Sequence, residues 1–188
     1  LWGQHRAGAI DEAEIEVLSG RLAPTQGTCM VMGTASTMGC LVEALGIALP
    51  GSGTIPATHA DRIRAAEASG RQAVALAKSG LRPTQLLTKA AFRNAMVVLQ
   101  AIGGSTNGLV HLSAIARRAG MTIDLEEFDA IGREVPVLID LKPSGDHYME
   151  HFHWAGGMPK LMKELRRHLD LDAVTISGQT IGEIADAA

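Results

Sequence analysis

The sequence is poor in aromatic residues and in cysteine. Its 188 residues include three Phe, two Trp, one Tyr and two Cys. So few aromatic side chains argue against stacking platforms for nucleobases and against aromatic cages for cationic ligands. Two cysteines are too few for a disulfide framework, and such thiols are more often free or bound to a metal in a reducing compartment.

The chain also lacks an excess of positive charge and any long apolar run. Lys and Arg number 17 against 20 Asp and Glu, for a formal charge of -3, and no basic cluster offers a phosphate backbone a binding surface. No stretch approaches the ~20 consecutive apolar residues that cross a bilayer, and the N-terminus has no signal-peptide pattern. We therefore expect a soluble, cytoplasmic protein with no nucleic acid partner and no membrane contact.

What the chain does have is apolar content, at 46% of its residues, which is enough to bury a core. Its length suits one domain or one lobe of a larger enzyme. The first residue is Leu1 and not Met, so we expect a trimmed chain or an excerpt of a longer protein.

Hydrophobic periodicity and helix start and stop signals predict a helix-rich chain. Gly20 is expected to stop the first helix, and Pro24 and Gly27 are expected to break any continuation of it. Short apolar segments bounded by turn residues predict strands. The expected helices are 11–20, 36–49, 58–70 or on to 80, 88–104, 105–120, 126–132, 159–169 and one after 178. The expected strands are 121–125, 135–141 and 173–177, and 28–34 is expected to be a buried strand or a tightly packed loop. Helices interleaved with strands predict an α/β fold, a helix-rich layered domain with short, mainly parallel strands.

Cys29 is the strongest candidate for a catalytic or metal-binding residue. It lies in GTCMVMGTAST, between glycines and hydroxyl residues and just before a helix N-terminus, where backbone N–H groups favour a thiolate or an anion. From the residues alone, three interpretations stay open: a buried small hydrophobe, which is the commonest, a metal or redox ligand, and a nucleophile. Cys40 lies beside the apolar stripe of the next helix and is expected in the core.

The segment GGSTN is a second candidate. Gly103 and Gly104 let a backbone approach a ligand closely, and the side chains that follow can offer donors to a carboxylate or phosphate at a helix start. The same residues would also be explained without a ligand, by glycines that end one helix and a hydroxyl residue that caps the next. The candidate substrate-binding residues, here and at the start of the earlier helix, are Thr34, Ser36, Ser105, Thr106 and Asn107.

Histidines gather near residue 150. His147, His151 and His153, with Asp146 and Glu150, would form a metal site only if the segment were helical. The following Ala155-Gly156-Gly157 favours a solvated or interface loop instead. Elsewhere, His59 and Asp61 are expected to cap a helix, and His111 is expected to be a core histidine.

Four segments together resemble a known family. They are GTCMVMGTASTMGCLVEALGIALPG, AFRNAMVVLQAIGGSTNGLVHLSAIARRAG, VPVLIDLKPSG and HWAGGMPKLMKEL, and the resemblance runs over essentially the whole chain. They are similar to the IlvD/Edd dehydratases, the dihydroxy-acid and sugar-acid (aldonate) dehydratases. The GTCMVMGTAST form is closer to the sugar-acid branch, whereas Cys40 and the GSGT loop are closer to the dihydroxy-acid branch.

The resemblance implies a hydro-lyase that converts a 2,3-dihydroxy acid into a 2-keto acid. Family members use an iron–sulfur cluster, commonly [2Fe-2S], held by three cysteines, and a Mg²⁺ ion near the substrate. Cys29 matches the last of the three cysteines and is thereby implied as an iron ligand, whereas Cys40 matches no ligand position. A metal ion that polarises the leaving hydroxyl removes the need for a strong acid at neutral pH.

The same resemblance implies that much of the site lies outside residues 1–188. The first two cluster cysteines and an Asp and a carbamylated Lys for Mg²⁺ belong upstream, and the catalytic serine base and a Glu belong to a β-rich C-terminal domain downstream. We therefore expect residues 1–188 to be a single partial domain, the later portion of the N-terminal α/β domain, which is inactive alone. Its expected partners are the rest of the polypeptide and further copies in a dimer or tetramer.

Two other hypotheses compete with this one. A non-catalytic helical domain could bind an anion or a partner through its helix caps. A cysteine hydrolase would need a histidine base close to Cys29, and no signature joins one to it.

Overall fold

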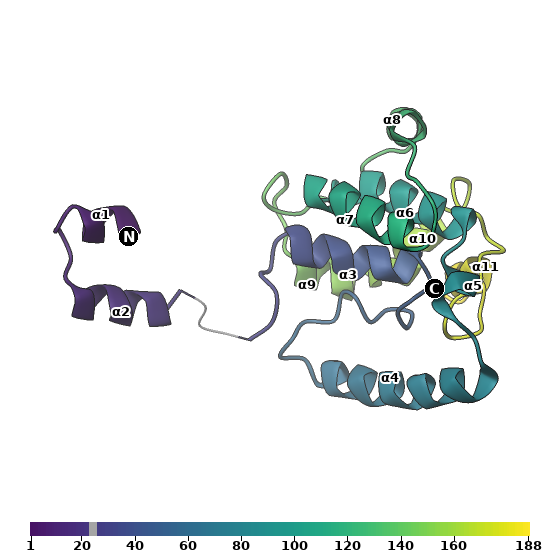
Figure 1. Cartoon of the computed structure of the whole chain (residues 1–188), viewed down its shortest axis with the longest axis horizontal. Helices are drawn as coiled ribbons and strands as arrows, with labels where there is room; N and C mark the ends of the chain where they lie inside the picture. Colours follow the sequence, from purple (N-terminus) through teal and green to yellow (C-terminus); the bar gives the residue numbers. More distant parts are fainter. Residues whose placement is uncertain (23–25) are drawn as a thin grey trace.

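The computed structural model describes residues 1–22 and 26–188, and these residues fold into helices without a regular strand (Figure 1). Pro24 lies outside the described residues. The helices are α1 (Trp2–Arg6), α2 (Glu12–Gly20), α3 (Thr34–Ala44), α4 (Ala60–Ser79), α5 (Pro83–Leu86), α6 (Lys89–Ala101), α7 (Thr106–Arg118), α8 (Leu125–Glu134), α9 (Met149–Trp154), α10 (Gly157–Glu164) and α11 (Ile181–Asp186).

Helix α6 forms the centre of the core. It packs against α3, α7 and α8, and residues on nearly every side of it are buried. Asn94 is fully buried on this helix, and its side-chain amide donates to the carbonyl of Asp170 at 2.9 Å and accepts from the Asp170 N–H at 2.7 Å. A buried amide side chain is tolerated here because both of its ends are hydrogen-bonded. These two hydrogen bonds between Asn94 and Asp170 also join α6 to the C-terminal segment. In that part of the chain α10 packs on α9 and α11.

The strands expected at 121–125, 135–141 and 173–177 are wrong, whereas residues 28–33 form a loop, the alternative expected for that segment. In the described part of the chain, β-type pairing is limited to two isolated bridges, Leu141 with His147 and Val174 with Thr180. The segment 135–141 runs extended, but Val137 is exposed and Leu138 donates its N–H to Ala101 at the end of α6, so no ladder forms. A strand needs a neighbour to accept a row of hydrogen bonds, and these apolar segments instead pack singly against helices. The fold is helix-rich, as expected, but not a layered α/β sheet structure.

Several helix ends differ from expectation. Helix α3 begins at Thr34 after the N-cap Gly33, and it ends at Ala44 because Gly46 adopts a left-handed conformation with φ +74°. Asp11, Thr88 and Ser105, the first residues of three expected helices, are N-caps, and the side chain of each accepts a backbone N–H. The N-caps of α4, α8 and α11 are His59, Asp124 and Thr180. The segment expected as a loop near residue 150 is the short helix α9.

Helix α4 lies at the edge of the fold, below the other helices in Figure 1. It has twenty residues and none of them is buried. Hydrogen bonds join it to the body: Arg62 donates to the carbonyls of Ser52 and Ile55, and Gln72 donates to the carbonyl of Ile176. Among the described helices, none is both long and apolar enough to cross a membrane.

Candidate functional site

The N-termini of α3 and α7 meet through their polar side chains. Asn107 donates from Nδ2 to Oγ1 of Thr34 at 2.8 Å, and the Thr34 and Ser105 hydroxyl oxygens lie 3.4 Å apart. Ser105 also caps α7 by accepting the N–H of Asn107 at 3.3 Å. Three of the five residues expected to bind substrate are thus in contact, although they come from segments about seventy residues apart.

Close backbone approach makes this meeting possible. Thr37 is fully buried, and its hydroxyl accepts the N–H of Ser105 at 3.0 Å. A Cβ atom on Gly104 would lie 2.6 Å from Leu99, and one on Gly108 would lie 2.9 Å from the Thr37 methyl group. The glycines therefore serve helix packing at this point, because a larger residue would push α7 away from α3.

Cys29 stands beside this junction with an exposed thiol. Its Sγ lies 3.6 Å from where a Cβ atom on Gly33, the N-cap of α3, would stand. The residues that follow it are fixed by backbone bonds, since Met30 accepts the N–H of Met149 at 2.8 Å and Met32 donates to Lys142 at 2.7 Å. The loop is therefore tied on its C-terminal side, with the thiol facing solvent.

The remaining two candidates occupy different environments. Ser36 is buried, and its hydroxyl donates to the carbonyl of Cys29 at 3.4 Å, so it contacts the cysteine backbone. Thr106 is exposed at the first position of α7. Among the described residues, no side chain caps the first turn of α3 by accepting its N–H groups. Two helix N-termini at one polar junction favour an anionic group such as a carboxylate.

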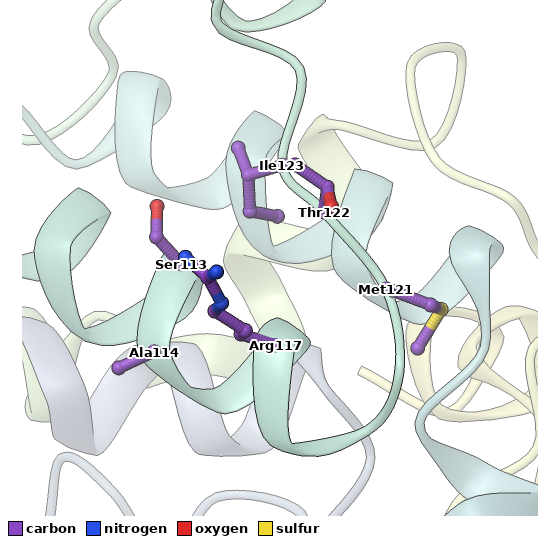
Figure 2. Close-up of a pocket in the computed structure, with 6 residues that line it drawn as sticks. All are labelled: Ser113, Ala114, Arg117, Met121, Thr122 and Ile123. Carbon is purple, nitrogen blue, oxygen red and sulfur yellow. The ribbon is translucent and has the colours of Figure 1, made fainter.

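The cavity drawn in Figure 2 lies elsewhere. It has a volume of about 280 Å³, and its wall is made by the later part of α7 and the segment before α8. Its lining residues are Ser113, Ala114, Arg117, Met121, Thr122 and Ile123. None of these belongs to the junction of α3 and α7, so the cavity and the candidate site are separate features.

Glu43 is a polar group that the sequence pattern does not reveal. It is 3% exposed on α3, and its carboxylate accepts the N–H of Gly51 at 2.6 Å and of Gly53 at 2.5 Å. Burial raises its pKa to about 7, although the two backbone hydrogen bonds act in the opposite direction. Its place within an apolar helical stripe gives no sign that it ties the GSGT loop to α3.

Cys40 is fully buried on the same helix, as expected. Desolvation raises the pKa of its thiol, and the neighbouring Glu43 acts in the same direction. A thiol that resists ionisation is a poor metal ligand, because the thiolate is the form that binds metals. Of the two cysteines, Cys29 is therefore the one whose side chain is accessible to a metal or a reagent.

The histidines are arranged differently from expectation. His151 and His153 are two positions apart on α9 and so point in different directions. His153 meets His59, the N-cap of α4, and Asp61, and one donor atom from each of the three lies within 4.8 Å of the others. Burial, followed by the nearby His59, lowers the pKa of His153. His111 is exposed, so the expectation of a core histidine is wrong.

Comparison with known proteins identifies the family. The model described as dihydroxy-acid/6-phosphogluconate dehydratase N-terminal matches residues 1–184. The chain is 47% identical over 188 residues to a dihydroxy-acid dehydratase of Caldanaerobacter subterraneus subsp. tengcongensis, covering 98% of this chain and 34% of that protein. It is 44% identical over 182 residues to one from Halothermothrix orenii, covering 96% and 33%. The chain spans about a third of the length of these relatives. It therefore belongs to the family of dihydroxy-acid/6-phosphogluconate dehydratase N-terminal domains.

Proposed function

We propose that the chain is part of a hydro-lyase that dehydrates a 2,3-dihydroxy carboxylic acid to a 2-keto acid. In this reaction the C2 proton and the C3 hydroxyl leave as water, and the resulting enol tautomerises to the ketone. Family membership and relatives named dihydroxy-acid dehydratase support the proposal. These names favour a dihydroxy acid over a sugar acid as substrate, and they do not favour a non-catalytic binding domain.

The observation that carries the proposal is the exposed Cys29 thiol beside two helix N-termini. We propose Cys29 as one ligand of an iron–sulfur cluster, with the remaining ligands supplied by other parts of a longer protein. Such a cluster, of the [2Fe-2S] type, would act as Lewis acid on the leaving hydroxyl, and a Mg²⁺ ion bound by residues outside this chain would hold the substrate carboxylate.

The residues at the junction would then orient the acid. The first turn of α3, which no described side chain caps, offers backbone N–H donors, and Thr34, Ser105 and Asn107 offer hydroxyl and amide groups beside it. Thr106, exposed in the first turn of α7, adds a further hydroxyl. Ser36 would act indirectly, because its hydroxyl holds the Cys29 carbonyl. The arrangement suits an anionic substrate that approaches the thiol from solvent.

The test uses the full-length protein that contains this chain, purified without oxygen and supplied with a branched 2,3-dihydroxy acid or a sugar acid. The 2-keto acid is trapped as a hydrazone and measured. Cys29→Ser is expected to abolish the visible absorption of the cluster and the turnover together, whereas Cys40→Ala should keep both. An intact cluster in Cys29→Ser would refute the ligand assignment, and no keto acid from either substrate would refute the reaction.

We also propose that residues 1–188 form one partial domain within that protein and that the protein is a homo-oligomer. Exposed apolar side chains support an interface, since Val110 on α7 and, in another segment, Val137 and Leu138 remain open to solvent. Sedimentation of the full-length protein checks the second point, and a monomer would contradict it.

A further inference from the structure

We propose that His59, Asp61 and His153 form a binding site for a divalent transition-metal ion, with zinc as the best match. The three side chains come from the start of α4 and from α9, far apart in the sequence. One donor atom from each lies within 4.8 Å of the others, so a small movement of the side chains would bring all three to a common ion. This proposal does not rest on the dehydratase reaction, and it involves neither Cys29 nor the junction of α3 and α7.

The donor set decides which metal is favoured. Two imidazoles and one carboxylate match the ligands of zinc and of similar transition metals, whereas Mg²⁺ and Ca²⁺ prefer oxygen ligands. Three protein ligands also leave one position of a four-coordinate zinc ion for water or for another ligand. The expected ion is therefore different from the Mg²⁺ that the family resemblance implies.

Groups outside the three ligating atoms already orient the two rings. Nδ1 of His153 lies 3.2 Å from the hydroxyl of the buried Thr54, and Nδ1 of His59 accepts the backbone N–H of Asp61 at 3.3 Å. Gly157, with φ +58°, makes room for that threonine, because a Cβ atom there would lie 2.5 Å from its Oγ1. Polar contacts to the rings of metal-binding histidines are typical of metal sites, since they fix ring orientation.

Two nearby positive charges, on Arg62 and Arg64, oppose the ion. Arg62 is close enough to lower the pKa of His153, and its guanidinium is held by the carbonyls of Ser52 and Ile55. The Asp61 carboxylate, which also pairs with Arg64, supplies the negative charge of the group. We therefore expect moderate affinity, which depends strongly on Asp61.

Trp154 provides a direct signal for binding. Its ring centroid lies 5.1 Å from that of His59 and 5.1 Å from that of His153, and the side chain is 62% exposed. A paramagnetic ion such as Co²⁺ bound between these histidines should quench its fluorescence. Trp2 is the other tryptophan of the chain, and its replacement leaves Trp154 as the single source of tryptophan fluorescence.

The experiment uses the 188-residue chain carrying Cys29→Ser and Trp2→Phe, so that neither the exposed thiol nor the second indole contributes. Zn²⁺ affinity is measured by competition with a chromophoric chelator, and Co²⁺ is followed by its visible absorption and by Trp154 quenching. Each of His59→Ala, Asp61→Asn and His153→Ala should weaken Zn²⁺ binding by at least ~10-fold, the lower range seen when support of a metal site is lost.

The matched controls are His147→Ala and His151→Ala. These exposed histidines also form a close pair, with ring centroids 5.5 Å apart, but they do not belong to the proposed site. Their removal should leave Zn²⁺ affinity and Co²⁺ quenching unchanged. Circular dichroism establishes that each variant is folded, and Zn²⁺ should raise the Tm of the parent but not of His153→Ala. Equal affinity in the parent and in a folded His59/His153 double variant, or equal loss in the controls, would overturn the proposal.

Discussion

Asn107 reaches across from the first turn of α7 to the first residue of α3, where its amide donates to the hydroxyl of Thr34 at 2.8 Å. The bond joins two helix starts that the chain separates by a long excursion through α4, α5 and α6. It is also exposed at the edge of the candidate substrate site. Its loss should therefore affect substrate binding more than it affects folding.

Asn107→Ala should lower the free energy of unfolding of the chain by about 1 kcal/mol, the usual net contribution of one hydrogen bond. In the full-length protein it should raise KM for the dihydroxy acid several-fold, because a donor at the junction is lost. Ser113→Ala is the control: its hydroxyl donates within α7 to Leu109, away from the junction. An unchanged KM in Asn107→Ala would remove Asn107 from the substrate site.

Gly108→Ala should destabilise the chain by about 1 to 3 kcal/mol, the usual cost of overpacking. The added methyl group would meet the side chains of Thr37 at 2.9 Å, Leu99 at 3.0 Å and Leu41 at 3.2 Å. Gly70→Ala on α4 is the matched control, since its Cβ would meet nothing within 4 Å, and the removal of a helical glycine should add about 0.5 to 1 kcal/mol. Urea unfolding of the three proteins measures both changes, and equal effects would contradict the close packing of α3 and α7.

Glu43 should make stability fall as pH rises. Its pKa is about 7 in the folded chain against an ordinary value of 4.5, so the folded state binds the proton more tightly than the unfolded state. The contribution is fully present below pH 4.5 and is lost as pH rises through 7, by about 3 kcal/mol in total. The measurement is the difference in unfolding free energy between the parent and Glu43→Gln from pH 4.5 to 8. A difference that is flat over this range would show that Glu43 stays ionised.

The two cysteines should differ sharply in reactivity. Cys29 is exposed, whereas Cys40 is fully buried and burial raises the pKa of its thiol. With the metal-free chain, a disulfide reagent should modify one thiol rapidly and the second after unfolding in guanidinium. Cys29→Ser should remove the rapid phase and Cys40→Ala the slow one. Two rapid phases in the native parent would contradict the buried position of Cys40.

The sequence predicts local features of this fold well. Helix caps such as Thr88 and Ser105 depend on a few neighbouring residues, and their side chains accept the expected backbone N–H groups. The strands fail because a strand depends on a distant partner: Val137 and its neighbours have the composition of a strand but lie exposed. An apolar, β-branched segment can run extended without joining a sheet.

The same distinction applies to the site. The position of Cys29 before a helix start is evident in the sequence, but its exposure is not, since buried cysteines are the commoner case. The partner of His153 is His59, which lies far upstream, so local spacing groups His153 with the wrong histidines. Glu43 is hidden in the same way, because the N–H groups it accepts belong to the loop after its helix.

The lack of buried residues in α4 has a consequence for the timescale on which this chain opens. A helix held by few tertiary contacts can unfold locally while the core around α6 stays intact, so its amide hydrogens should exchange with solvent long before those of α6. His59 is the N-cap of α4 and Asp61 lies in its first turn, whereas His153 belongs to α9. Each local unfolding of the N-terminal end of α4 would therefore separate the proposed ligands. An ion bound by these residues would hold the start of α4 against α9 and slow this opening. The amide hydrogen exchange rate of α4 would therefore report whether the metal site is occupied.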